Sequence, residues 1–370
     1  MQKFLSRLFA RLMKSWSWVL LIVLSILIKW ASWYPEWVER NYTYELYPLI
    51  SKIQRFLFGW IPFSLGDLFY LFLVLIIIIK TGVFLKLLFR KKLNRHYFIS
   101  GLQQIIFFFL FVYVFFNLLW GLNYNRKGIS LQLQLEAKSY SIQDLDTLAG
   151  AMQKRLNFYA ESVTTSQRDS FNRKRTLFSE SNEAYKLAVK KYSFLDYTPK
   201  SVKPSLFSYL GNYLGFQGYY NPFSGEAQVN TTIPRFLEPF VTMHEIAHQL
   251  GYAKENEANF VGYLASKEYQ SPAFQYSLYF DMYHYTINEV ARRDTVLALR
   301  FQKQLHPQVI RDMKELRDFY ARYKNPIEPI IMWGYGNYLK ANNQPSGKMS
   351  YNEVVAFLIS YYKKYGIEML

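Results

Sequence analysis

The sequence predicts a mainly helical protein in two parts, a region of three transmembrane helices followed by an α+β domain with a small sheet. Three observations support this fold class. Residues 1–122 contain three long apolar stretches, which predict the membrane region. Most of residues 123–370 show the hydrophobic spacing of amphipathic helices. Between residues 199 and 239 the composition shifts to Gly, Pro, Asn and Tyr, which is typical of turns and short strands.

The composition excludes several classes of protein. With 51% hydrophobic and only 19% charged residues, the chain has enough apolar surface to fold, so it is not disordered. The absence of cysteine excludes a disulfide scaffold, a Cys-ligated zinc and a thiol nucleophile. The net charge is +17, but residues 1–122 carry 14 Lys and Arg against four Asp and Glu. More than half of the excess charge therefore lies on the most apolar third, which predicts a lipid bilayer as partner and no nucleic acid.

The three apolar stretches span residues 16–34, 65–89 and 101–122. Each reaches about the 20 residues that a helix needs to cross a hydrocarbon core. The first has Trp16 and Trp18 at one end and Trp33 and Tyr34 at the other, as interfacial aromatic belts do. A cleaved secretory signal is the alternative for this stretch, because its strictly apolar centre is short.

The distribution of basic residues predicts the orientation in the membrane. Basic residues precede the first stretch and separate the second from the third: Lys3, Arg7, Arg11, Lys14, Lys86, Arg90, Lys91, Lys92 and Arg95. The positive-inside rule then places the N-terminus in the cytoplasm and everything after Leu122 outside. For a Gram-negative cell this predicts a multi-pass protein of the inner (cytoplasmic) membrane with a periplasmic C-terminal domain. Asp67, near the start of the second stretch, is expected to be exposed at the outer interface.

The C-terminal domain, residues 123–370, is expected to be mostly helical. Hydrophobic spacing predicts helices over 141–160 and 178–194, and helical texture returns after Phe240 and continues to Lys364. Weak alternation over 226–233 predicts one strand at the edge of a small sheet.

The chemistry of the domain is indicated by the motif His244-Glu245-Ile246-Ala247-His248, an H-E-x-x-H. Histidines at positions i and i+4 share one face of a helix, so both imidazoles can bind one zinc ion. The intervening Glu245 is placed to accept a proton from a water on that zinc. Pro239 suits the first turn of such a helix and Gly251 suits the position after its end.

Two carboxylates follow that could supply a third ligand. On a second helix starting near Ala253, Glu255 and Glu257 point about 200° apart, so only one can face the metal. We favour Glu255, because its face carries small or polar residues that permit close approach, whereas Glu257 shares its face with residues of core character. Asn259, one turn beyond Glu255, is placed to hydrogen-bond a ligand histidine.

The motif pair resembles that of the zinc peptidases whose third ligand is glutamate, the gluzincin group, and this resemblance implies a zincin-like domain. That group commonly has Asp where this chain has Asn259. The metzincin pattern fails, because it would place Lys254 at a ligand position. The whole chain, with WGLNYNR (120–126), GYYNPFSGEAQVN (218–230) and HEIAHQLGYAKENEANF (244–260), resembles the bacterial membrane family of domain of unknown function 3810. That resemblance implies a membrane-anchored, metallopeptidase-like protein of the Gram-negative envelope.

Two further features of a peptidase site are less well defined. An edge strand before the catalytic helix often holds the substrate backbone, and residues 228–232 are either such a strand or an ordinary structural one. A residue that stabilises the oxyanion is expected to be Tyr or His. The candidates are His284 with Tyr283 or Tyr276, and simple packing of these residues is the alternative.

The sequence therefore predicts a membrane-anchored zinc metallopeptidase that hydrolyses peptide bonds of a peptide or protein substrate in the cell envelope. Its zinc ligands are His244, His248 and Glu255, its catalytic base is Glu245, and Asn259 supports a ligand. The alternative is a non-catalytic envelope binding or scaffold protein with a structural or vestigial zinc site.

Overall fold

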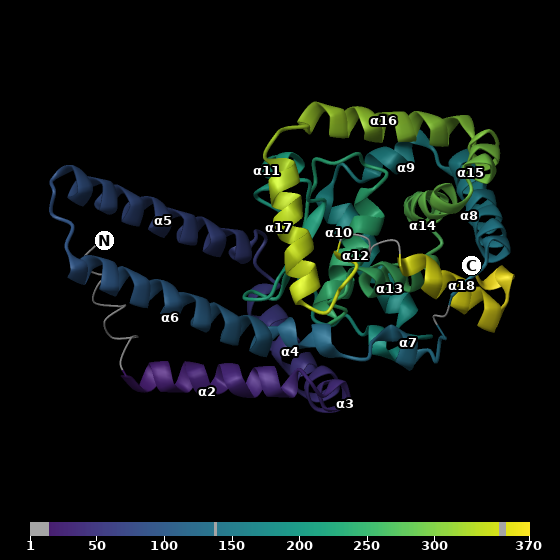
Figure 1. Ribbon diagram of the computed structural model, residues 1–370. Helices are drawn as coiled ribbons and strands as arrows, with labels where there is room; N and C mark the ends of the chain where they lie inside the picture. Colours follow the sequence, from purple (N-terminus) through teal and green to yellow (C-terminus); the bar gives the residue numbers. More distant parts are fainter. Residues whose placement is uncertain (1–14, 137–138, 348–352) are drawn as a thin grey trace.

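The structure is a computed structural model that describes residues 15–136, 139–347 and 353–370. Figure 1 shows three long helices projecting from one side of a rounded helical domain. The four basic residues before the first apolar stretch, Lys3, Arg7, Arg11 and Lys14, lie outside the described residues. Their part in setting the orientation stays a prediction.

Two of the projecting helices, α5 (Leu65–Phe89) and α6 (Arg95–Leu119), are long and apolar enough to cross a membrane. The bounds of α5 agree with the predicted span. Helix α6 begins six residues earlier than predicted, because the side chain of Asn94 accepts a hydrogen bond from the backbone nitrogen of Tyr97 and caps the helix. The N-terminal end of α5 and the C-terminal end of α6 meet the domain, and these two helices associate the chain with a membrane (Figure 1).

The first apolar stretch forms α2 (Ser15–Ala31), which is shorter than predicted. The chain then bends by 101°, so a third span exists only if α2 and the helical segment after the bend are counted together. Helix α2 packs on α6, where the rings of Trp18 and Phe107 lie 5.2 Å apart.

The segment after the bend was not predicted from the sequence. It comprises α3 (Pro35–Trp37), a π-helix η1 (Val38–Leu46) and α4 (Tyr47–Phe58). Its mixture of charged and aromatic residues gives no apolar run. Its fold depends on contacts with α6 and with the domain. The buried hydroxyl of Tyr42 donates to the carbonyl oxygen of Leu118 at 3.1 Å, and that of Tyr47 donates to the carbonyl oxygen of Gln249 at 2.7 Å.

The domain is mainly helical around one core. Its helices are α7 (Ile129–Gln132), α8 (Ile142–Ser162), α9 (Thr165–Ser170), α10 (Lys174–Ala188), α11 (Ser208–Leu214), α12 (Glu238–Gln249), α13 (Glu255–Lys267), α14 (Pro272–Arg293), α15 (Thr295–Gln302), α16 (Pro307–Tyr323), α17 (Glu328–Ala341) and α18 (Val354–Tyr365). The prediction over 141–160 agrees closely with α8, which packs along α14. The prediction over 178–194 is shifted, because α10 starts at Lys174 and ends at Ala188.

A three-stranded sheet lies beside α12, in the order β1-β3-β2. Strand β1 (Val202–Pro204) pairs in parallel with β3 (Glu226–Val229), and β2 (Gly218–Asn221) pairs with β3 antiparallel. The prediction of an edge strand over 226–233 is wrong. Strand β3 is the central strand and ends at Val229, so β2 and β1 form the edges.

Buried carboxylates join the N-terminal end of α5 to this sheet. Glu226 of β3 accepts hydrogen bonds from the backbone nitrogens of Leu65 and Gly66 at 3.2 and 2.7 Å, and it pairs with Lys203 at 3.3 Å. The expectation that Asp67 is exposed is wrong. Asp67 is fully buried and accepts hydrogen bonds from the Leu206 nitrogen at 2.7 Å and from Tyr219. The free N–H groups of a helix start attract carboxylates, which explains why α5 begins here.

We expect Glu226→Gln to destabilise the full-length protein by about 3–5 kcal/mol, because it leaves the buried Lys203 ammonium without its counter-ion. Glu183→Gln is the matched control, since it breaks an exposed ion pair with Lys186 and should cost about 0.5 kcal/mol or less. Denaturant unfolding in detergent measures both. Equal effects of the two substitutions would contradict this role of Glu226.

Candidate metal centre

Helix α12 carries the H-E-x-x-H motif and is buried on every side. Pro239 occupies its first turn, and Gly251 follows its end with φ of +88°, a left-handed conformation that favours glycine. Both positions agree with the sequence prediction. The turn at Gly251 lets α13 begin at Glu255 and fold back along α12.

The structure brings His244, His248 and Glu255 together. The Oε2 atom of Glu255 lies 3.2 Å from Nε2 of His244 and 3.5 Å from Nε2 of His248. Two ligands at about 2.0–2.1 Å from a tetrahedral zinc ion lie roughly 3.3 Å apart, so this spacing fits one zinc ion. Among the described residues, no other group of three or more such side chains converges in this way.

The opposite nitrogen of each imidazole has a partner that fixes the ring. Nδ1 of His244 lies 2.8 Å from Oδ1 of Asn259, and Nδ1 of His248 lies 2.7 Å from the carbonyl oxygen of Tyr252. Because a carbonyl oxygen only accepts, Nδ1 of His248 carries a hydrogen. Each ring therefore directs Nε2 toward Glu255, as metal-binding histidines do.

Glu257 is not part of this cluster. Its carboxylate lies 3.7 Å from Nζ of Lys254 and packs against Gly128, where a Cβ atom would lie 1.9 Å from Oε1 of Glu257. The geometry thus supports the choice of Glu255 over Glu257, and a side chain at residue 128 would displace the Glu257 carboxylate.

The cluster has unusual electrostatics because it is buried. Burial alone would raise the pKa of Glu255, but His248 and His244 outweigh this effect and hold it below its usual range. Burial opposes a charge on His248, yet the Glu255 carboxylate raises its pKa above the usual value. The cluster therefore needs a positive charge at its centre, which either a proton or a metal ion supplies.

Glu245 lines the same cavity as the three cluster residues but is not part of the cluster. It is buried, its Oε2 atom has no hydrogen-bond partner, and burial raises its pKa to about 8. Strand β2 passes so close that a Cβ atom at Gly218 would lie 2.5 Å from Oε1 of Glu245. A carboxyl group that gains and loses a proton near neutral pH is suited to general acid–base chemistry.

These residues line a cavity of about 960 Å³. His284 lies in its wall, as the sequence analysis allowed, but Tyr276 and Tyr283 do not; Tyr276 instead contacts Asp312. The sequence analysis missed Tyr335 of α17, whose hydroxyl donates a 2.5 Å hydrogen bond to Oε1 of Glu255. The chain has 32 tyrosines, and no sequence pattern distinguishes Tyr335 from the others.

Side chains from residues 47–126 donate hydrogen bonds to the end of α12. The carbonyl oxygen of His248 accepts a hydrogen bond from Nε1 of Trp120 at 2.9 Å, and that of Gln249 accepts one from the Tyr47 hydroxyl at 2.7 Å. Arg126 donates to the carbonyl oxygen of Gly251 at 3.2 Å. The carbonyl oxygen of His248 also accepts a hydrogen bond from the Gly251 nitrogen at 3.0 Å. Side chains between residues 47 and 126 thus complete the hydrogen bonding of the turn that carries His248.

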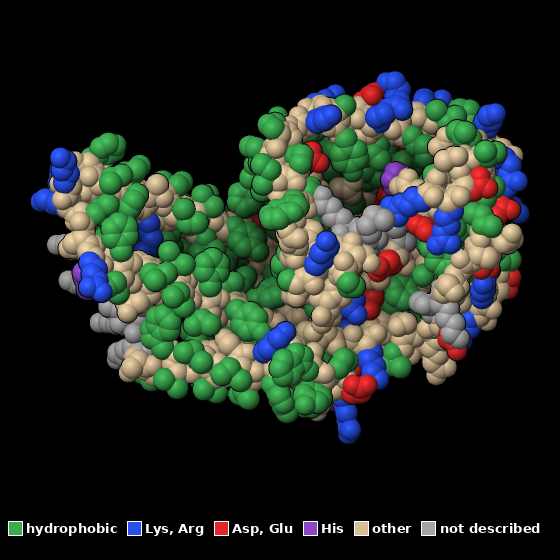
Figure 2. Space-filling model, in the orientation of Figure 1, with side chains coloured by type: hydrophobic (Ala, Val, Ile, Leu, Met, Phe, Trp, Pro, Cys, Tyr) green, Lys and Arg blue, Asp and Glu red, His purple; other side chains and the backbone are tan. Residues whose placement is uncertain are grey.

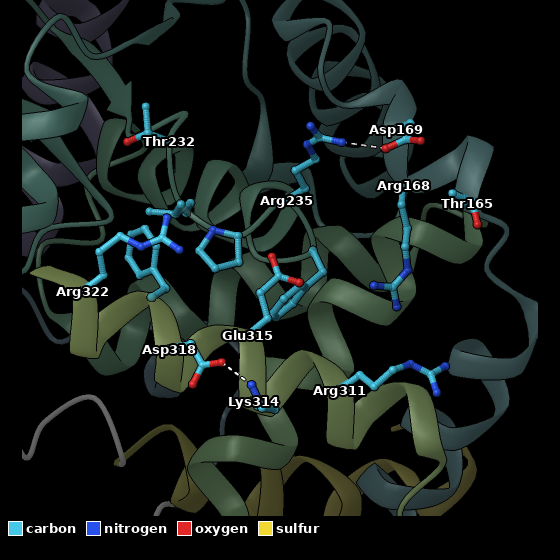
Figure 3. A pocket seen from close by; sticks show the side chains of 14 residues that line it. Thr165, Arg168, Asp169, Thr232, Arg235, Arg311, Lys314, Glu315, Asp318 and Arg322 are labelled. Carbon is cyan, nitrogen blue, oxygen red and sulfur yellow. Dashed lines mark hydrogen bonds and ion pairs between the residues drawn. The ribbon is translucent and has the colours of Figure 1, made fainter.

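A second cavity, of about 720 Å³, lies between α9 and α16 and is rich in basic residues (Figure 3). Three of its cations are paired with carboxylates, and two of these pairs are Arg235 with Asp169 at 2.6 Å and Lys314 with Asp318 at 2.5 Å. Arg168 is bound by Asp312 in two hydrogen bonds. No set of ligand groups converges here among the described residues, so the first cavity is the candidate site.

Comparison with known proteins identifies one matching family. A family model described as a protein of unknown function (DUF3810) matches residues 42–359, which include both parts of the chain and all residues of the metal cluster. No curated protein and no solved structure matches the chain significantly.

We expect the purified full-length protein to bind about one zinc ion per chain. Binding should be lost in His244→Ala and Glu255→Ala, and Asn259→Ala should weaken it by about 10–100-fold, because the His244 ring loses its support. Glu257→Ala is the matched control and should keep the metal. Elemental analysis after dialysis measures the content, and loss of zinc only in Glu257→Ala would contradict the assignment.

Zinc affinity should fall as the pH is lowered, because a proton competes with the metal for Nε2 of His248. The pKa of His248 is raised above its usual value near 6.5, so the decline should begin above that pH. Below it the affinity should drop by about tenfold per pH unit. Competition with a chromophoric chelator measures this slope, and a flat profile from pH 8 to 5 would exclude the histidine as a ligand.

Proposed function

The chain belongs to the family described as a protein of unknown function (DUF3810), and we propose from its site that it is a membrane-anchored zinc metallopeptidase. It hydrolyses peptide bonds of a peptide or protein substrate in the cell envelope. The observation that carries this proposal is the convergence of ligand atoms from His244, His248 and Glu255 within 4.8 Å of one another, beside Glu245, whose Oε2 atom has no hydrogen-bond partner.

The zinc ion, when bound, would polarise a carbonyl group and lower the pKa of a coordinated water to about 7. The remaining roles belong to side chains of the chain. Glu245, in its ionised form, accepts a proton at its Oε2 atom and returns it to the leaving amine. A pKa raised by burial to about 8 lies close enough to neutral pH for the carboxyl group to exchange a proton in both directions. Tyr335 holds one oxygen of Glu255 and so directs the other toward the histidines.

The surroundings of the site support a zincin-like arrangement. A helix with the two histidines, a second helix with the glutamate and a short sheet lie against one another. Residues Gly218, Tyr219 and Tyr220 of β2 line the cavity, and β2 is an edge of the sheet. The backbone of β2, rather than that of β3, is thus placed to pair with an extended peptide. His284 is the candidate to stabilise the oxyanion.

The distribution of charge supports an extracytoplasmic location for the site. The loop between α5 and α6 carries Arg90, Lys91 and Lys92, and it lies at the end of these helices that is remote from the domain (Figure 1). The positive-inside rule places this loop in the cytoplasm and the domain on the other side. In a Gram-negative cell the protein lies in the inner membrane and its domain in the periplasm.

Replacing Glu245 by Gln should lower peptide hydrolysis by about 100- to 10,000-fold, because the amide cannot accept the proton. Zinc content should be unchanged, since Glu245 is not a ligand. A fluorogenic peptide library incubated with the full-length protein in detergent provides the readout, and Glu257→Gln serves as the control with full activity. Undiminished hydrolysis in Glu245→Gln would overturn the mechanism. Zinc without hydrolysis in the wild type would favour the scaffold alternative.

A further inference from the structure

The cavity that holds the metal cluster is walled partly by the membrane-spanning helices. Tyr70 of α5 and Phe116 of α6 line it together with Trp120, which follows α6 directly. Tyr70 lies five residues inside α5, which corresponds to about 7.5 Å along the helix axis. The cavity therefore extends alongside the first turns of α5.

Helix α5 borders the cavity and packs little against the rest of the described chain. None of the apolar window of α5 is buried against the described chain. Its contacts with α6 occur toward the end remote from the domain, where the rings of Phe84 and Tyr97 lie 6.4 Å apart and Lys80 bonds Gln104 at 2.5 Å. In a membrane, lipid chains surround α5 next to the cavity.

Helix α17 forms another wall of the cavity and has two distinct faces. Tyr335 and Tyr338 point into the cavity. The opposite face exposes Ile330 and Trp333, which are 66% and 72% accessible. From Pro329 to Leu339 the helix has no charged residue, and it runs across the axes of α5 and α6 (Figure 1). A helix with this composition and direction is suited to the interface of a bilayer.

The neighbouring helix α11 extends the same surface. Its side chains Tyr209 and Leu210 are 69% and 53% accessible. Two residues before α11, the nitrogen of Leu206 donates its hydrogen bond to Asp67 in the first turn of α5, so α11 starts at the outer end of a membrane span. Figure 2 shows hydrophobic side chains gathered over α11 and α17, on the side of the domain that faces α5. An apolar surface continuous with membrane helices is most simply covered by lipid.

We propose that the surface of α11 and α17 rests in the outer interface of the bilayer and that the cavity receives its substrate from the membrane. The substrate is a polypeptide anchored in the bilayer, whose extracytoplasmic segment enters beside α5, α6 and α17. The choice of a polypeptide rests on the proposed peptidase function. The position of the surface in the membrane does not.

The first test measures the position of α17 in the full-length protein. Because the chain has no cysteine, Ile330→Cys gives a single labelling site for a fluorophore. Val296→Cys on α15 is the matched control, an apolar residue that is 76% accessible on a part of the domain remote from α5 (Figure 1). In phosphatidylethanolamine–phosphatidylglycerol vesicles, nitroxide on shallow acyl positions should quench the label at 330 and spare that at 296. Quenching of both labels only by an aqueous quencher would overturn the proposal.

The second test compares one fluorogenic peptide library in two forms, soluble and fused to a single transmembrane helix in the same vesicles. Confinement should make cleavage of the anchored form faster by roughly tenfold or more. The double substitution Ile330→Glu, Trp333→Glu should remove this preference and leave cleavage of the soluble form unchanged. Equal rates for both forms in the wild type would overturn membrane entry and favour soluble peptides. No cleavage of either form would refute the peptidase function, and the quenching measurement would still decide the position of α17.

Discussion

The structure depends on how the C-terminal turn of α12 is held. A helix end exposes carbonyl oxygens that need hydrogen-bond donors, and a buried helix cannot obtain them from water. Here side-chain donors come from residues far earlier in the chain. Trp120 donates to the carbonyl oxygen of His248, and Tyr47 and Ser51 donate to that of Gln249. Arg126 donates to the carbonyl oxygen of Gly251. The position of His248 is therefore set by the region that carries the membrane helices.

Further buried ion pairs and hydrogen bonds hold the same part of the chain. Arg126 pairs with Glu39 of η1 at 3.1 Å, and both side chains are almost inaccessible to water. Glu226 and Asp67 hold the start of α5 in the same way on the other side of the site. A buried pair is costly to break, so these contacts fix the orientation of the membrane helices relative to α12. The predicted division at residue 122 separates two parts that are joined by extensive polar contacts.

Features that depend on local sequence could be predicted. The apolar run of α5, the two histidines on one face of α12, and the turn at Gly251 follow from spacing and backbone preference alone. The choice of Glu255 followed from the small residues beside it, which let α13 pack closely on α12. Features that depend on distant partners could not be predicted. Tyr335 lies 80 residues from Glu255, the burial of Asp67 depends on Leu206, and the central place of β3 depends on β1.

The central claim is that His244, His248 and Glu255 surround one metal ion in the intact protein. X-ray absorption spectroscopy of the zinc-loaded full-length chain tests it most directly. The account predicts about four ligands of nitrogen or oxygen at about 2.0–2.1 Å, with the outer-shell scattering of two imidazole rings and no sulfur. A six-coordinate shell of oxygen atoms without imidazole scattering would contradict it.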